Sequence, residues 1–216
     1  MPDTDAAPVT PKTLNDLSER VAMCDPSAGK SRLQRQSARS AVVVVAADAL
    51  NRIYVLEAWA DRCSTNALVE RIFRINEQFQ PRVFGIEANA MQSTFGDTVA
   101  MLAAERKINL PRVPVYQDTR VDKDFRIRNI LQPIVADGRL ILADTGQEEL
   151  RSEIVSFPQK HEKDLIDALA SACALLPRRT VARQQAEDAD QLAAYLRGTG
   201  VPASVIERRM REVRLA

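Results

Sequence analysis

The sequence predicts a mixed α/β domain in which helices cover both faces of one central sheet. Three short apolar runs come first along the chain, and apolar runs then alternate with helical patterns. Consecutive strands followed by β/α units favour a mixed sheet, because each crossover helix must pack on a face of that sheet. The 45% hydrophobic and 27% charged residues are typical of a folded globular protein. With 216 residues, we expect one compact domain plus tails.

Three strands are predicted at the start of this domain. Residues 21–25 form an apolar run that ends at Pro26, where a strand leaves the core for a turn. Residues 40–48 contain four consecutive valines, as expected of a strand that is buried on both faces. Residues 53–59 supply the third strand after a short turn.

Helices and strands are predicted to alternate in the rest of the domain. Apolar residues recur at helical spacing after the N-cap candidates Ser64 and Thr65, until Pro81 stops the pattern. The same criteria predict strands at residues 82–87, 113–116 and 139–143, and helices at residues 91–107, 123–135, 148–156 and 163–176. The order therefore begins βββαβαβα.

The two ends of the chain differ in composition from this domain. Residues 1–13 hold three prolines and no apolar periodicity, and we expect a disordered leader there. Residues 178–216 are rich in Arg, Gln and acidic residues and are expected to form a helical C-terminal arm. The folded domain is thus predicted to span residues 14–177.

Charge and cysteine usage exclude several kinds of site. A net charge of +1 gives no global attraction for nucleic acid, so any DNA contact must come from local clusters of Arg and Lys. Cys24, Cys63 and Cys173 are scattered, and His161 is the only histidine, which argues against a zinc site or a Cys/His nucleophile pair. The longest apolar run is too short for a membrane span and no secretory signal is present, so we expect a cytoplasmic protein.

Three carboxylates stand at the edges of apolar elements. Asp25 ends the first predicted strand, Glu87 ends the fourth, and Asp164 lies in the first turn of the last core helix. If the first and fourth strands are neighbours, Asp25 and Glu87 emerge at the same end of the sheet, and the start of that helix can pack over it.

Carboxylates gathered so closely repel each other unless cations neutralise them. Mg²⁺ and Mn²⁺ prefer such oxygen ligands, together with waters and substrate phosphate oxygens. Two such ions can activate an attacking water and stabilise the leaving oxygen of a phosphodiester. The carboxylates therefore indicate phosphodiester hydrolysis.

The runs around these carboxylates resemble the motifs of a known family. Residues 23–27, residues 85–89 with Gln92, and residues 164–168 are similar in order and spacing to motifs of the nuclease domain of tailed-phage terminase large subunits, which belongs to the ribonuclease H-like superfamily. Residues 52–56, Lys123 with Arg126 and Ile127, and Phe157 with Pro158 are similar as well. The resemblance spans roughly residues 21–176.

This resemblance implies a ribonuclease H-like fold and a metal-dependent endonuclease that cuts concatemeric viral DNA during genome packaging in the host bacterium. The roles that it implies are catalysis and binding of two Mg²⁺ or Mn²⁺ ions by Asp25, Glu87 and Asp164, support by Asp167, and DNA binding by Lys123 and Arg126. The implied partners are double-stranded DNA, the packaging ATPase domain, the small terminase subunit and the portal. We expect the protein to be a monomer in isolation.

The chain departs from the family pattern in two places. The family often has paired aspartates directly after a histidine, whereas Lys163 precedes Asp164 here and His161 lies further upstream. No GxxxxGK[ST] motif occurs, and the ATPase domain that should precede the nuclease is absent. We therefore expect an excised domain or a stand-alone nuclease subunit.

Structural readings of the same residues stay open. Asp25 before Pro26 can simply initiate a turn, and Asp164 can complement the dipole of its helix. Residues 28–31 imitate the end of a phosphate-binding loop, but Cys24 stands where that loop needs its first glycine, so a nucleotide site is a distant alternative.

Two further functions remain as alternatives. A Holliday-junction resolvase would use a similar carboxylate site but needs a two-fold dimer to cut two strands symmetrically. A non-catalytic module would instead hold DNA or a packaging partner through Lys123, Arg126 and the basic arm around residues 207–211.

Overall fold

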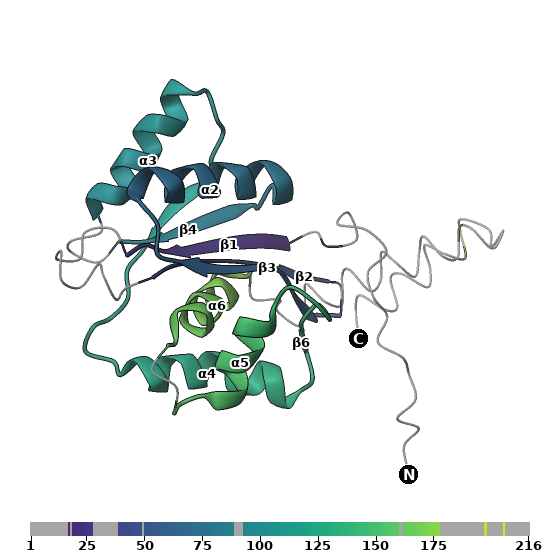
Figure 1. Ribbon diagram of the computed structural model, residues 1–216. Helices are drawn as coiled ribbons and strands as arrows, with labels where there is room; N and C mark the ends of the chain where they lie inside the picture. Colours follow the sequence, from purple (N-terminus) through teal and green to yellow (C-terminus); the bar gives the residue numbers. More distant parts are fainter. Residues whose placement is uncertain are drawn as a thin grey trace, which may run out of the picture. The chain divides into compact units, whose positions relative to one another are not determined.

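The computed structural model describes residues 17, 19–27, 39–48, 50–88, 93–159, 162–177, 197 and 205 (Figure 1). Within this part of the chain, six strands form one sheet that is flanked by five helices. The strands are β1 (Glu19–Asp25), β2 (Ser40–Ala47), β3 (Ile53–Asp61), β4 (Val83–Glu87), β5 (Arg112–Val115) and β6 (Leu140–Ile141). The helices are α2 (Thr65–Phe79), α3 (Ser93–Glu105), α4 (Lys123–Ala136), α5 (Glu148–Ser156) and α6 (Asp164–Leu175).

The sheet is mixed, with the strand order β5-β4-β1-β2-β3-β6. β2 runs antiparallel to both of its neighbours, β1 and β3, whereas the β1–β4, β4–β5 and β3–β6 pairs are parallel. Three antiparallel strands thus come first, and two β/α units extend the sheet on the free side of β1. This arrangement confirms the predicted mixed α/β fold class with its βββαβαβα order.

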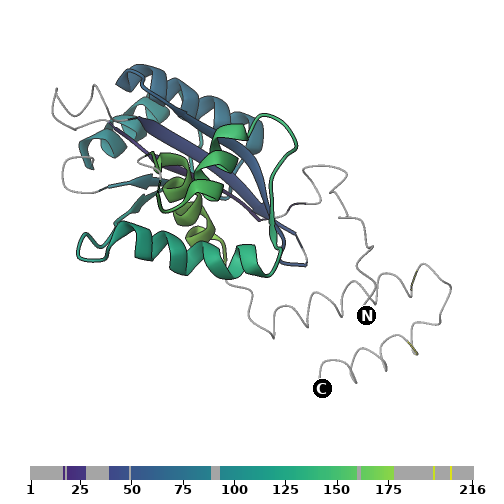
Figure 2. The same cartoon turned by 60° about the horizontal axis from the view of Figure 1, so that its bottom comes forward.

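Strict alternation along the central strands sends side chains into two separate cores. Val43 and Val45 of β2 pack on one face, and Val42 and Val44 pack on the other. α2 and α3 cover the second of these faces, and α4, α5 and α6 cover the first (Figure 1). Figure 2 turns this three-helix layer toward the viewer.

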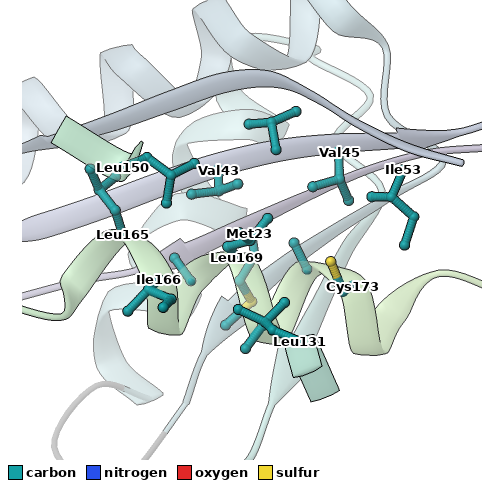
Figure 3. Packing of buried hydrophobic residues seen from close by; sticks show 14 of the residues in the cluster. Met23, Val43, Val45, Ile53, Leu131, Leu150, Leu165, Ile166, Leu169 and Cys173 are labelled. Carbon is teal, nitrogen blue, oxygen red and sulfur yellow. The ribbon is translucent and has the colours of Figure 1, made fainter. Parts of the chain in front are cut away.

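α6 lies directly on the sheet in the first of these cores. Figure 3 shows Leu165 and Leu169 of α6 pointing toward Met23 and Val43 of the sheet, and both leucines are fully buried. Complete burial of a leucine contributes about 1.5–3 kcal/mol, so these contacts fix the position of the helix firmly. The first turn of α6 is thereby held over one edge of the sheet.

The element boundaries agree closely with the sequence patterns. Ser64 caps α2 by accepting a hydrogen bond from the backbone N–H of Ala67 at 3.2 Å. The predicted strand at 139–143 is reduced to the two residues of β6, and the helix predicted at 91–107 ends at Glu105. No helix among the described residues is long and apolar enough to cross a membrane.

The chain divides into two compact units, Met1–Leu176 and Pro177–Ala216. In the second unit the structure describes Pro177 and the helical positions Arg197 and Val205. The predicted leader, the phosphate-loop mimic at residues 28–31 and most of the predicted arm lie outside the described residues.

Gly85 of β4 provides a test of the packing between α6 and the sheet. A Cβ atom at this position would lie 2.5 Å from Leu175 Cδ1, 2.9 Å from Met23 Sδ and 3.0 Å from Val115 Cγ2. We expect Gly85→Val to lower the free energy of unfolding by about 1–3 kcal/mol, measured by urea denaturation, because these side chains must move to make room.

Gly96→Ala in α3 is the matched control, since an added Cβ there meets only the end of the Arg112 side chain, at 2.8 Å. Its stability should stay equal or rise, because alanine favours a helix over glycine. Equal stability of Gly85→Val and the native protein would contradict the close packing of α6 on β4.

Candidate metal centre

Two carboxylates lie side by side where β1 and β4 end. The parallel register pairs Met23 with Gly85 and Cys24 with Ile86, so Asp25 and Glu87 follow as the next neighbours. Because side chains alternate along a strand, both carboxylates share the face of Met23, which α6 covers. Both residues are buried, with 8% and 6% of their surface exposed.

The first turn of α6 brings two more carboxylates, Asp164 and Asp167, to the same edge. Asp167 is the deeper of the two, with 3% of its surface exposed, and its charge acts on Glu87. The side chain of Asp164 is 25% exposed and lies 3.5 Å from the Nε atom of Arg39. The residue predicted to support the site is therefore more deeply buried than Asp164, which was predicted to be a ligand.

The proximity of these groups raises the proton affinity of Glu87. Its pKa rises from 4.5 to about 8, first because burial disfavours the charged form and then because of the charges of Asp25 and Asp167. A hydrogen bond with Asp25 raises the pKa further, while Arg126 lowers it. Glu87 thus carries a proton at neutral pH as long as nothing else neutralises the cluster.

Two cations from α4 pair with Asp167. Lys123 Nζ lies 3.0 Å from Asp167 Oδ2, and Arg126 donates a hydrogen bond to Asp167 Oδ1. Burial is the largest single effect and lowers the pKa of Lys123, but the charge and hydrogen bond of Asp167 together with the charges of Asp25 and Asp164 raise the pKa overall. Both residues predicted to bind DNA therefore lie at the carboxylates, where the structure shows ion pairs.

The sequence patterns missed Gln117, which connects these groups. Its Nε2 atom lies 3.2 Å from Glu87 Oε2 and 3.3 Å from Ser171 Oγ, and it donates to both acceptors. Its Oε1 atom accepts a hydrogen bond from Arg126. A polar residue two positions after the end of β5, which pairs in parallel with β4, was the signal that could have found it.

A pair of hydrogen-bonded serines holds the chain just after Asp25. Ser27, two residues after Asp25, donates its backbone N–H to Ser40 Oγ at 2.9 Å, and the two hydroxyl oxygens lie 2.9 Å apart. These bonds fasten the chain that leaves β1 to the start of β2. Asp25 is therefore held on both sides, by a buried strand before it and by this pair after it.

The residues at this edge suit a divalent cation. The neighbouring carboxylates offer only oxygen donors, as Mg²⁺ and Mn²⁺ prefer, and a cation would relieve the repulsion that raises the pKa of Glu87. No group of three or more Asp, Glu, His or Cys side chains among the described residues is already arranged as a metal-binding cluster. Lys123 and Arg126 supply positive charge there instead.

Three residues named with the predicted motifs, Asn89, Gln92 and His161, lie outside the described part of the chain. Cys24 is fully buried in β1, and burial, ahead of the charge of Asp25, raises the pKa of its thiol. It is therefore unsuited to act as a nucleophile.

No protein-family model matches this chain, and no curated protein matches it significantly. Similar solved structures are those of Thermus thermophilus RuvC, alone and in complex with a Holliday junction substrate. Each has 16% identity and a TM-score of 0.41, over 71% of this chain and 90% of that chain. The yeast mitochondrial Holliday junction resolvase has 12% identity and a TM-score of 0.44, over 73% of this chain and 78% of that chain. At these identities and TM-scores the similarity decides nothing about function, and the function must be argued from the site.

The raised pKa of Glu87 predicts how the stability of the metal-free protein depends on pH. The folded protein keeps a proton on Glu87 up to about pH 8, whereas the unfolded chain releases it near 4.5. The stabilisation is therefore complete below pH 4.5 and is lost as the pH rises through 8. Glu153, whose pKa burial raises to about 7, adds to the same fall.

We expect the Tm in EDTA to decrease between about pH 5 and pH 9, and Glu87→Gln to reduce this decrease, because glutamine has no proton to lose. Glu77→Gln, which changes an exposed carboxylate on α2, should leave the decrease unchanged. A pH dependence that is equally steep in Glu87→Gln and in the native protein would contradict the crowding of Glu87.

Proposed function

We propose that this protein is a metal-dependent endonuclease that hydrolyses phosphodiester bonds of DNA. The observation that carries the proposal is the parallel pairing of β1 with β4, which puts Asp25 and Glu87 side by side under the first turn of α6. Buried carboxylates that approach so closely are costly to keep for stability alone, and such clusters concentrate at functional sites.

Asp25 and Glu87 would hold the metal together with Asp164 and Asp167 from α6. A pair of divalent ions bound there supplies an activated water and stabilises the leaving oxygen of the phosphodiester. Gln117 keeps one carboxylate oxygen of Glu87 in place through the hydrogen bond at 3.2 Å. A hydrogen bond to a metal-binding carboxylate typically affects how tightly that carboxylate binds the metal.

Lys123 has the exposure that a phosphate contact requires. Its side chain is 44% exposed while its ammonium group lies at the buried Asp167, so it can reach both the carboxylates and solvent. A lysine at this position would bring the DNA backbone to the carboxylates without reading the base sequence.

Two substrates fall within this proposal. The sequence motifs resemble the terminase nuclease, which implies cutting of long duplex DNA during genome packaging. Of the solved structures reported above, one is named as a Holliday junction resolvase and another holds a Holliday junction substrate. A resolvase would act on a four-way junction as a two-fold dimer. Parallel assays on linear duplex and on a mobile four-way junction, with the oligomeric state measured by light scattering, separate the two.

Substitution of the carboxylates tests the proposal directly. We expect the native protein to nick supercoiled plasmid in Mg²⁺ or Mn²⁺ and to lose this activity in EDTA. Asp25→Asn, Glu87→Gln, Asp164→Asn and Asp167→Asn should each lower the cutting rate by about 100-fold or more, because each removes a metal ligand.

Asp97→Asn on α3 is the matched control, because its side chain is 80% exposed and α3 packs against the opposite face of the sheet. It should cut at the native rate. DNA binding without cutting in any metal, by protein that is folded, would favour the non-catalytic module instead.

The role of Lys123 is tested through the salt dependence of DNA binding. We expect Lys123→Gln to weaken binding of duplexes of any sequence and to reduce the slope of log K against log salt by about 1, since one phosphate contact is lost. Fluorescence anisotropy in Ca²⁺ measures the slope without cleavage.

The control for this measurement is Lys107→Gln, which removes the same charge from an exposed position just after α3. A slope that both variants leave unchanged would exclude Lys123 from the DNA contact.

A further inference from the structure

A buried carboxylate outside the proposed metal centre lies behind the first turn of α6. Glu153 of α5 has a side chain with 0% exposure, and it is among the largest fully buried side chains of the described residues. Its Oε2 atom accepts a hydrogen bond of 2.9 Å from the backbone N–H of Ile166. Ile166 lies between Asp164 and Asp167, so this bond reaches the turn that carries both carboxylates.

The start of α6 needs such an acceptor from elsewhere in the protein. The first N–H groups of a helix have no partner within the helix, and a polar N-cap side chain usually accepts from them. Lys163 occupies the N-cap position, and its side chain has no acceptor to offer; its ammonium group instead pairs with Asp124 of α4 at 2.6 Å. Glu153 therefore supplies from α5 the cap that the sequence before α6 lacks.

Arg39 joins this carboxylate to the sheet. Arg39 directly precedes β2, and its Nη2 atom lies 3.8 Å from Glu153 Oε1, while its Nε atom lies 3.5 Å from Asp164 Oδ2. Oε1 has no hydrogen-bond partner among the described residues, and the Arg39 guanidinium faces it at 3.8 Å. A buried carboxyl group with an oxygen that forms no hydrogen bond is costly. A protein with apolar residues of similar size in place of such a pair is often as stable or more stable.

We propose that Glu153 is a positioning residue for the metal centre. It fixes the first turn of α6, and thereby the distance of Asp164 and Asp167 from the strand ends that carry Asp25 and Glu87. The inference rests on the proposed function, since it gives Glu153 a role at the same site. Glu153 acts through the backbone of Ile166 and is not itself a ligand.

The experiment compares Glu153→Ala and Glu153→Gln in the full 216-residue chain. Binding of Mn²⁺ is measured by titration calorimetry, and hydrogen exchange of the peptide that covers residues 163–168 is measured without metal. Glu153→Ala should weaken Mn²⁺ binding by about 10-fold and remove the protection of this turn, as expected when support behind a metal ligand is lost. Glu153→Gln should restore both properties to near native values, because its amide oxygen can accept the same hydrogen bond.

Glu149→Gln is the matched control. Glu149 also lies on α5 and pairs with Arg39, but its side chain is 44% exposed and forms no hydrogen bond or ion pair with α6 within the described residues. Its Mn²⁺ affinity and exchange should remain native. If Glu153→Ala does not fold, Glu153→Leu replaces it, because leucine fills a similar volume without an acceptor and Arg39 keeps its pairs with Glu149 and Asp164.

Three results would overturn the inference: native Mn²⁺ affinity in the folded variant that lacks the acceptor, native protection of its 163–168 peptide, or an equal loss in Glu153→Gln. A native protein that binds no Mn²⁺ would instead remove the proposed function. The exchange measurement in metal-free protein still decides whether Glu153 holds the turn, so the two failures are distinguishable.

Discussion

The parallel pairing of β1 with β4 is the constraint on which the candidate site depends. In a parallel pair both strands end at the same edge, and residues in register point to the same face. Asp25 and Glu87 are therefore forced together, whatever their mutual repulsion. The structure accommodates them by protonation of Glu87, by the hydrogen bond from Gln117, and by the positive charge of Arg126.

α6 completes the site because it both packs on the sheet and carries carboxylates to the strand ends. Its buried face packs apolar residues on the sheet, where Leu165 and Leu169 each contribute about 1.5–3 kcal/mol by burial. Its first turn carries acidic residues to the strand ends. The apolar packing is as large as the roughly 1–3 kcal/mol that one poorly satisfied buried polar group costs, so the helix stays in place despite the charges at its start.

The parts of the site that follow from local patterns were predictable. Asp25 and Glu87 each end an apolar run, and runs that alternate with helices indicate parallel strands with a shared edge. Arg39 and Glu153 were not predictable in this way, because nothing near either residue in the sequence marks it as charged and buried. Arg39 meets Glu149 across 110 positions of the sequence, and only the packing of α5 behind α6 brings them together.

The sequence by itself determined the order of strands and helices and most of their boundaries, since alternation and capping depend on residues within a few positions of each other. The valines of β2 and the Ser64 cap of α2 are examples. Only the tertiary structure decided that Asp167 lies deeper than Asp164 and that Lys123 and Arg126 pair with it. Which side of a helix faces the sheet, and what meets it there, depends on elements far apart in the chain, and no local pattern encodes that packing.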